Sequence, residues 1–527
     1  MPQTNQNKVG ILFPNGSTPV YDSLWALGNR VGGSWIFTKA SRFPAVAPLH
    51  KMYPRPAGEV SSFASHLWAH STMDYSLELN ARGGVWPYRW QITSGPAGAT
   101  IGETLSTSSV GGLTLHSIGS DYGKITWSGA KSGSHAFVVT CTDQVGSVVT
   151  YNFTVTVDDT KFVFLDSTAA DDTGAGTLAA PKKTFQACWV SGFGGRTLVI
   201  KNGTYSATES GDAFNIGLNN SNRPTAIIAF TGHSPVLTMN SLFRDGGTDG
   251  SANDFLLRGI TLNQPRSEEN IKVLFFSGTQ NRVKVQSCTF SNVGVGTNGG
   301  DNPGSIVFFE ASGRHTYTVV TDCVLASTCQ TQLCVYFKTD YALFENNRST
   351  GTTIGAHNGD TFINAKGGSG GVQACNHITH RANSYVGNCN RGVYSFMNQG
   401  LTPVDQECCW NISVNTGGPS CSWNAQNFDS GGAGAGPMHM YANSFSSPAI
   451  AVMWGTFPDI IAQGNAIVSV PPVGAYQDGI TDDSAANFTF TAITDQVLSA
   501  AQLSATGTLT GTGTTYRLTH GAELFSS

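Results

Sequence analysis

Short runs in which apolar and polar residues alternate fill the chain from about residue 73 to residue 158. Examples are Tyr75-Ser-Leu-Glu-Leu79, His135-Ala-Phe-Val-Val-Thr140 and Thr150-Tyr-Asn-Phe-Thr-Val-Thr-Val157. Glycine-rich breaks separate these runs. Strict alternation places one face of each strand in a core and the other face in water. The pattern predicts an antiparallel β-sandwich over residues 73–158.

From residue 161 short strand-and-turn units recur with a period of about 30 residues. The units begin at Cys288-Thr-Phe290, Cys323-Val-Leu325, Asn347, Asn383-Ser-Tyr385, Asn411-Ile-Ser-Val414, Asn443-Ser-Phe445 and Asn465-Ala-Ile-Val468. Such short strands cannot close a core alone, so neighbouring units must stack and pair edge to edge. Asparagine suits the corners because it tolerates left-handed backbone and can bond to the asparagine one rung away. The repeat predicts a parallel β-solenoid.

The two ends of the chain lack this period. Residues 1–72 are rich in proline, glycine and aromatic residues, and Trp25, Trp35 and Trp68 carry too much apolar area for a solvated tail. We expect this segment to dock on another protein or to pack on the next domain of its own chain. Residues 471–527 are expected to cap the last rung, because an uncovered rung would pair with other chains.

Two short helices are predicted, one at the start of the solenoid and one in the C-terminal segment. The first holds Phe185 and Trp189 on one face and would cover the open start of the solenoid. The second would run over residues 495–503, inside the C-terminal cap. The predicted domains are residues 1–72, 73–158, 159–470 and 471–527.

Composition narrows the function classes. The 29 Lys and Arg against 34 Asp and Glu give a net charge of −5, and charged residues make up only 12% of the chain, which argues against a nucleic-acid binder. No stretch approaches the ~18 apolar residues that cross a bilayer, and no apolar region follows the polar N-terminus, so we expect neither membrane insertion nor export by an ordinary signal. The 11 cysteines form no CxxC pair, which predicts buried, reduced thiols and no metal or cofactor.

Two segments resemble known families. Gly83-Gly-Val-Trp-Pro-Tyr-Arg-Trp90 and Gly123-Lys-Ile-Thr-Trp127 resemble the cadherin-like immunoglobulin-type module. Asp171-Asp-Thr-Gly-Ala-Gly-Thr-Leu-Ala-Ala-Pro181, followed by Gly195-Arg-Thr-Leu-Val-Ile-Lys-Asn-Gly-Thr-Tyr205, resembles the opening segment of right-handed parallel β-helices of the pectin-lyase-like superfamily. These resemblances imply an all-β protein, an Ig-like β-sandwich followed by a right-handed parallel β-helix.

The combined architecture resembles bacteriophage tailspikes and tail appendages. This resemblance implies a parallel homotrimer on the virion, made in the host cytoplasm and held to phage tail proteins through residues 1–72. It also implies a bacterial surface polysaccharide, capsule or O-antigen, as the partner that is recognised and depolymerised. Two alternatives stay open: a non-enzymatic structural or receptor-binding appendage, and a secreted bacterial pectin-lyase-like lyase, which the N-terminus disfavours.

The chain contains no compact catalytic motif such as GxSxG or HExxH, so we sought chemistry in columns of the solenoid. Aligning five strands by their apolar cores stacks Ser277, Glu310, Lys338, Asn364 and Met397. Rungs are ~4.8 Å apart, so Glu310 and Lys338 would touch. The pair could serve as general acid and base on a glycan, or be a cross-strand ion pair.

A second polar cluster lies in predicted loops. A hydrolase would use two carboxylates ~5 to 9.5 Å apart, which Asp360 with Asp340 or Glu310 could supply. A lyase would need a base such as Lys366 or His357, with a cation to neutralise a uronate. The predicted substrate-binding residues are Tyr336, Tyr341, Arg391, Tyr394 and Trp410. Ordinary core positions are the alternative for the aromatic residues among them.

Overall fold

The structure is a computed structural model of the 527-residue chain. It describes residues 47–54, 65–102, 105–110, 113–118, 121–143, 145–190, 192–207, 215–217, 224–239, 242–244, 254–264, 272–277, 279, 281–293, 305–309, 313–329, 332–349, 352–354, 362–366, 375–389, 393–398 and 404–415, with further short strands near both ends.

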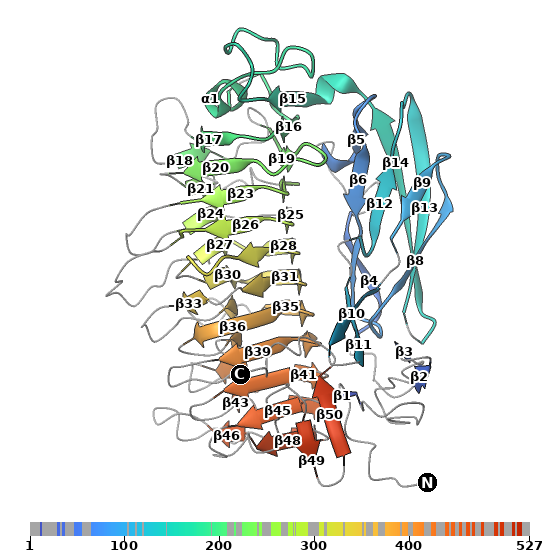
Figure 1. Cartoon of the computed structure of the whole chain (residues 1–527), viewed down its shortest axis with the longest axis vertical. Coiled ribbons are helices and arrows are strands. Elements are labelled where there is room, and N and C mark those ends of the chain that lie inside the picture. Colours follow the sequence, from blue (N-terminus) through green and yellow to red (C-terminus); the bar gives the residue numbers. More distant parts are fainter. Residues whose placement is uncertain are drawn as a thin grey trace.

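Three long parallel sheets dominate the molecule (Figure 1). Sheet 1 contains β15 (Phe162–Leu165), β16 (Thr197–Ile200), β19 (Ala226–Ala229), β22 (Leu256–Arg258), β25 (Asn281–Gln286), β28 (His315–Thr321), β31 (Thr339–Glu345), β35 (Asn376–Arg381), β38 (Gln406–Cys409), β41 (Met438–Tyr441), β44 (Ile460–Gln463) and β47 (Phe490–Ile493). Sheet 2 contains β17 (Thr204–Ala207), β20 (Val236–Met239), β23 (Thr261–Asn263), β26 (Thr289–Ser291), β29 (Val324–Leu325), β32 (Arg348–Ser349), β33 (Thr352–Ile354), β36 (Ser384–Cys389), β39 (Ile412–Asn415), β42 (Ser444–Ser447), β45 (Ala466–Ser469) and β48 (Gln496–Ser499). Sheet 3 contains β18 (Asn215–Gly217), β21 (Leu242–Arg244), β24 (Lys272–Phe276), β27 (Ser305–Phe309), β30 (Gln332–Phe337), β34 (Ile363–Lys366), β37 (Tyr394–Asn398), β40 (Trp423–Asn427), β43 (Met453–Gly455) and β46 (Tyr476–Asp478).

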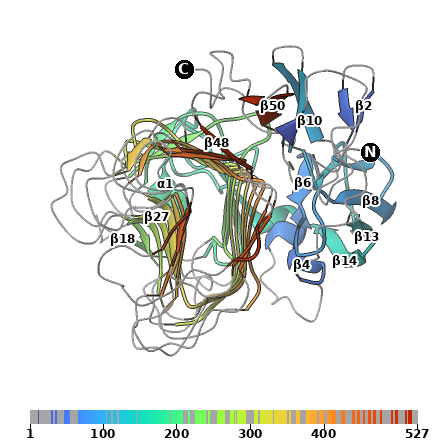
Figure 2. The same cartoon turned by 90° about the horizontal axis from the view of Figure 1, so that it is seen from below.

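The chain visits the three sheets in turn, for example through β25, β26 and β27 and then through β28, β29 and β30. Each strand pairs in parallel with its counterpart one turn later. Seen along its axis, the solenoid is a three-sided tube of stacked turns (Figure 2). The fold class is therefore an all-β parallel β-helix, as the repeat predicted.

Two-residue turns join sheet 1 to sheet 2. The first residue of the turn has positive φ in successive rungs, at Ser287, Asp322, Asn346, Ala382 and Trp410. The second residue is the repeated cysteine or asparagine of the sequence pattern. Asn347 Nδ2 donates to Asn383 Oδ1 at 2.9 Å, and Asn383 Nδ2 donates to Asn411 Oδ1 at 3.0 Å. The asparagine ladder predicted from the repeat is confirmed for these rungs.

The solenoid interior is apolar, and its first turn is covered by the helix α1 (Phe185–Cys188). The Thr184 side chain accepts a hydrogen bond from the Ala187 amide and so caps the helix. The Phe185 and Trp189 rings stack at 5.3 Å and are buried, which confirms the predicted covering helix. The nine cysteines whose side chains the structure describes are all buried and free.

The region before the solenoid is a β-sandwich of short sheets whose strands are antiparallel except for the parallel pair β5 (Trp68–Ala69) and β14 (Val148–Val157). Its four-stranded sheet contains β5, β14, β13 (Ser134–Thr142) and β8 (Arg89–Ser94). Its three-stranded sheet contains β6 (Tyr75–Glu78), β12 (Lys124–Trp127) and β9 (Ala99–Ile101). Three pairs flank these sheets: β4 (His50–Tyr53) with β7 (Asn80–Arg82), β10 (Leu105–Val110) with β11 (Leu113–Ile118), and β2 (Asn29–Val31) with β3 (Ser34–Ile36). One further small sheet contains β1 (Ile11–Leu12), β50 (Thr514–Leu518) and β49 (Leu509–Gly511), and 3-10 turns lie at Ser65–Leu67 and Asp159–Lys161.

The sandwich begins before residue 73 and the solenoid continues beyond residue 470, the two boundaries predicted from the sequence. β4 and β5 belong to the sandwich, although they fall in the predicted segment 1–72, and the Lys161 ammonium lies 4.8 Å from the Trp68 ring. The side chains of Trp25 and Trp35 lie outside the described residues. At the other end β48 continues sheet 2 where a helix over residues 495–503 was expected, because pairing with β45 overrides local helix propensity.

The sandwich packs along the outer face of sheet 1 (Figure 1; Figure 2). One hydrophobic cluster joins Trp86 and Val85 of the sandwich to Val319, Leu343 and Trp410 of the solenoid. Sheet 3 lies on the side of the solenoid away from the sandwich (Figure 2). A long ligand therefore has access to the solenoid through sheets 2 and 3 rather than through the covered part of sheet 1.

Candidate functional site

Among the predicted catalytic residues that the structure describes, Lys338 and Lys366 lie at the ends of sheet 3 strands, and Asp340 lies in β31 of sheet 1. Glu310 follows β27 directly, Lys338 follows β30, and Lys366 is the last residue of β34. Asp360 and Arg391 come shortly before β34 and β37 in the sequence. Glu310, His357, Asp360 and Arg391 lie outside the described residues, as does the side chain of Lys366.

The register of sheet 3 corrects the predicted column of Ser277, Glu310, Lys338, Asn364 and Met397. Phe309 pairs with Tyr336, not with Phe337 as the alignment required. Lys366 pairs with Phe337 on one side and with Met397 on the other. A uniformly apolar strand gives no alternation from which the register could be fixed, so a shift by one residue is invisible in the sequence. Lys338 instead occupies the turn into sheet 1, with φ of 46°.

Three predicted sugar-binding rings lie in the protein core. Tyr336 stacks on Phe344 at 4.8 Å, and its hydroxyl lies 2.8 Å from His380 Nε2 inside the solenoid. Tyr394 is completely buried. Trp410 packs against Trp86 of the sandwich at 5.4 Å and is also buried. These rings fill the interior, so the core alternative holds for them and direct contact with a glycan does not.

Asp340 and Tyr341 belong to a polar and aromatic cluster at the corner between sheets 3 and 1. We call Arg314, Tyr317, Asp340, Tyr341 and His377 the corner cluster. The Arg314 guanidinium forms an ion pair with the Asp340 carboxylate, which also accepts a hydrogen bond from Asn376 Nδ2 at 3.0 Å. Arg314 and His377 remain partly exposed, at 34% and 29% of their side-chain surface. The corner cluster is therefore within reach of a ligand in solution.

The rings of the corner cluster stack in one column, because successive rungs place them at the same left-handed position. Tyr341 lies 4.9 Å from Tyr317 and 4.4 Å from His377. His50 of the sandwich also stacks on Tyr341, at 4.7 Å. Since its ring faces are covered, Tyr341 can offer a ligand its edge and hydroxyl but no stacking platform.

The carboxylate beside this column is held as an anion. Asp405 lies 2.9 Å from His377 Nδ1 and 2.8 Å from the Arg82 guanidinium. Burial alone would raise the pKa of Asp405, but the hydrogen bonds from His377 and Arg82 outweigh it and lower the pKa. Asp405 thus serves as an acceptor and ion-pair partner at this corner, not as a proton donor.

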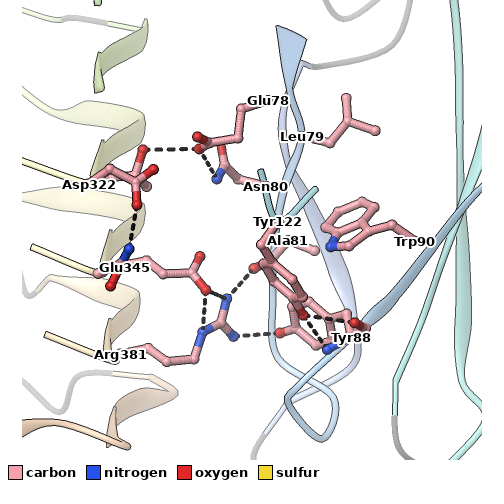
Figure 3. Close-up of a pocket in the computed structure, with 12 residues that line it drawn as sticks. Glu78, Leu79, Asn80, Ala81, Tyr88, Trp90, Tyr122, Asp322, Glu345 and Arg381 are labelled. Atoms are coloured by element: carbon pink, nitrogen blue, oxygen red, sulfur yellow. Dashed lines mark hydrogen bonds and ion pairs between the residues drawn. The ribbon is translucent and has the colours of Figure 1, made fainter. Parts of the chain in front are cut away.

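A second polar cluster lies at the seam between the sandwich and sheet 1 (Figure 3). Arg381 donates to Glu345 at 3.1 Å, to the Tyr88 hydroxyl at 2.6 Å and to the Ala81 carbonyl at 2.9 Å. Glu78 forms a hydrogen bond with Asp322 across the seam. We call these residues the seam network.

Burial raises the pKa of two carboxyl groups in the seam network. Burial and the nearby Glu78 carboxylate raise the pKa of Asp322 well above its usual value. Burial also raises the pKa of Glu345, despite the attraction of Arg381. For Glu78 the effect of burial is outweighed by Lys284, whose Nζ lies 3.2 Å from Oε1, and the pKa is lowered.

Raised carboxyl pKa values are typical of catalytic acids, but the space at the seam excludes that role. The cavity measures about 10 Å³, which is the room that a single water needs. No sugar can reach Asp322 or Glu345 in this arrangement. The seam network therefore fixes the sandwich on the solenoid, and the candidate functional site is the side of sheet 3 with the corner cluster at its edge.

The sequence analysis did not find the seam network, because its members lie far apart in the chain; Arg381 and Tyr88 are separated by 293 residues. One signal was present: Lys284 lies inside a strand of sheet 1, and Glu345 and Arg381 are the last residues of two others.

No group of three His, Cys, Asp or Glu side chains suited to a metal ion occurs within the described ranges. Over the same part of the chain, no helix has the length and apolarity needed to traverse a bilayer.

Comparison with known proteins gives structural similarity alone. No protein-family model and no curated protein sequence matches this chain. A Family 28 exopolygalacturonase from Yersinia enterocolitica superposes with a TM-score of 0.39 and 11% identity, covering 82% of this chain and 90% of its own. A rhamnogalacturonan lyase gives 0.32 and 12%, over 63% and 90%. The GH136 lacto-N-biosidase from Eubacterium ramulus gives 0.35 and 8%, over 64% and 67%. The first two are pectin-lyase-like parallel β-helix proteins, whereas the tailspike and cadherin-like resemblances stay predictions.

Proposed function

We propose that this protein binds and depolymerises a bacterial surface polysaccharide along sheet 3, as a phage tailspike does. The observation that carries the proposal is the placement of the sandwich, which covers sheet 1 and leaves sheet 3 on the opposite side (Figure 2). Lys366 is the last residue of β34 in sheet 3, and in the sequence Glu310 follows β27 and Asp360 comes shortly before β34. We therefore assign the reaction to the face of sheet 3, which a long ligand can reach and beside which the predicted reactive residues lie in the sequence.

The solenoid supplies the geometry that a polymer requires. Residues at equivalent strand ends repeat every ~4.8 Å along a rigid ladder, so a glycan chain lying across the rungs meets several of them at once. An acid and a base on different rungs of the same face would then flank one glycosidic bond. Asp360 with Glu310 would act as the carboxylate pair of a hydrolase, and Lys366 or His357 as the base of a lyase.

A binding-only function is favoured by one observation. Asp340 is the described member of the predicted carboxylate set, and its oxygens are already engaged by Arg314 and Asn376. Such a carboxylate orients its neighbours and accepts hydrogen bonds but is a poor nucleophile or acid. A receptor-binding appendage would need the corner cluster only as a contact surface for the glycan.

The test is incubation of the full chain with capsular polysaccharide and lipopolysaccharide from candidate host bacteria, followed by sizing of the glycan. We expect shortening by the wild type and a loss of about 10²–10⁴-fold in rate for Glu310→Gln, Asp360→Asn or Lys366→Met. Asp121→Asn, at an exposed carboxylate of the sandwich, is the matched control and should leave the rate unchanged. Binding without shortening would remove the enzymatic half, and absence of binding to every glycan would overturn the proposal.

The tailspike part of the proposal adds assembly. We infer a homotrimer that attaches to tail proteins through the N-terminal residues and projects the solenoid outward. Light scattering of the full chain should then give three times the 55.5 kDa of one subunit. A monomer that persists at high concentration would count against both the trimer and the tailspike assignment.

A further inference from the structure

A cavity of about 40 Å³ lies between the sandwich and the first turns of the solenoid. Its walls come from β5 and β6 of the sandwich and from β15, β16, β19 and β22 of sheet 1, which adjoin one another at the start of the solenoid (Figure 1). The volume is room for roughly three waters, or for one small polar group. The cavity lies at the seam, apart from sheet 3.

Arg258 brings a positive charge to this cavity. In the part of the chain that the structure describes, its guanidinium has one acceptor, the Ser76 carbonyl, at 2.6 Å from Nη1. The group carries five N–H donors, so most of them remain for another partner. Burial lowers the pKa of Arg258 in spite of the attraction of Glu78. An oxyanion would stabilise this buried guanidinium, because two of its oxygen atoms can accept parallel hydrogen bonds from the planar group.

Two further polar side chains that line the cavity lack partners among the described residues: His66 from the sandwich and Thr197 from sheet 1. His66 is 8% exposed, and neither of its ring nitrogens has a hydrogen-bond partner. Thr197 is 3% exposed, and its Oγ1 is likewise unpartnered. Buried polar groups are nearly always hydrogen-bonded, so their convergence on one cavity is the mark of a ligand site.

The protonation states fit an anionic ligand. Burial lowers the pKa of His66 to about 4, so the imidazole is neutral at physiological pH and offers one N–H donor. His70 is already engaged by Thr72 and Asp159. Asp74 lines the cavity as an opposing charge, but it is exposed and water screens it. Two carboxylates outside the lining also act here, Glu78 on Arg258 and Asp254 on His66. Three donors of different geometry therefore surround the space that a carboxylate or phosphate group would fill.

We propose that this cavity is a binding site for a small oxyanion, held by the Arg258 guanidinium with His66 and Thr197. The ligand is a free anion such as inorganic phosphate, or the carboxylate of a larger molecule such as a uronic acid. In either case it would link the 3-10 turn Ser65–Leu67 of the sandwich to the solenoid strands β16 and β22. The site is independent of any depolymerase activity on sheet 3.

The test measures binding to the full chain by isothermal titration and by thermal denaturation. The probes are inorganic phosphate, acetate and glucuronate, each against chloride at matched ionic strength, because chloride accounts for general screening. We expect at least one oxyanion to raise the melting temperature of the wild type above the chloride value. Preference for phosphate would identify a free anion, and preference for glucuronate the acidic group of a sugar.

Variants separate a built site from a water-filled gap. Arg258→Met should raise the dissociation constant by at least about tenfold, and Thr197→Val should raise it less. Arg89→Met, at an exposed arginine of β8, is the matched control and should bind as the wild type does. If Arg258→Met does not fold, Thr197→Val decides in its place because it keeps the shape of the side chain. No effect of any oxyanion beyond chloride, or unchanged binding in the cavity variants, would overturn the proposal.

Discussion

The hydrogen-bonded carboxyl pair Glu78 and Asp322 gives the sandwich–solenoid seam a pH dependence that one substitution should remove. Burial and the Glu78 charge raise the pKa of Asp322, whereas Lys284 overcomes the effect of burial on Glu78 and keeps its pKa low. The folded protein therefore holds one proton on Asp322 at pH values where the unfolded chain has lost it. Because this pKa is raised on folding, its contribution to stability is complete below the ordinary carboxyl pKa and is lost as the pH rises.

The size of the effect follows from the single proton. While the folded chain binds one proton more than the unfolded chain, the free energy of unfolding falls by about 1.4 kcal/mol for each unit of pH. Asp322→Asn replaces the protonated carboxyl by an amide whose N–H donates to Glu78 at every pH, so this slope should disappear. Glu345, whose pKa is also raised, stays in the variant and leaves its own share of the pH dependence. Asp322→Leu removes the hydrogen bond instead and should cost about 1–3 kcal/mol.

The assay is urea unfolding followed by tryptophan fluorescence, from about pH 5 to about pH 8, for the wild type and both variants. The exposed Asp121→Asn serves as the control, and its pH profile should follow that of the wild type. If the wild type and Asp322→Asn lose stability with the same slope, Asp322 does not carry the proton and our account of the seam network is wrong.

Two further predictions concern the ladder and the boundary of the fold. Asn383→Ala leaves the buried Asn347 amide groups without their acceptor and should lower the free energy of unfolding in urea by about 1–3 kcal/mol. The control Asn152→Ala, on the exposed face of β14, should lower it by less than about 0.5 kcal/mol. Equal losses in the two variants would contradict a stabilising ladder. Deletion of residues 1–72 removes β4 and β5 from their sheets and should unfold or aggregate the sandwich, as judged by circular dichroism and gel filtration, whereas a deletion ending at residue 46 leaves both strands in place. A folded, monodisperse 1–72 deletion would show that these strands are dispensable.

The architecture could be predicted to a large extent from local patterns. Alternation of apolar and polar residues identified the sandwich strands, because a strand has a period of two and one buried face. The recurring Asn347, Asn383 and Asn411 identified the turns of the solenoid, because the two-residue corner between sheets 1 and 2 has the same backbone geometry in the rungs where the structure describes these residues. The covering helix with Phe185 and Trp189 followed from the same logic.

The sites could not be predicted in the same way. Register in sheet 3 is set by contacts between turns, and the uniformly apolar Leu333-Cys-Val-Tyr-Phe337 contains no alternation that would reveal it. Tyr336 and Tyr394, predicted to bind sugar, are core residues. The residue type alone does not distinguish a buried aromatic ring from an exposed one, so the sequence could not exclude them.

What the sequence by itself determined is the repeat, and with it the parallel solenoid, because strand length, turn residues and backbone geometry are properties of neighbours in the chain. What only the tertiary structure decided is which face the sandwich covers and which charges meet there. Glu78 and Lys284, 206 residues apart, are brought together by the docking of two preformed surfaces. Such a contact depends on the shape and charge of whole faces, and no pattern within either segment encodes it.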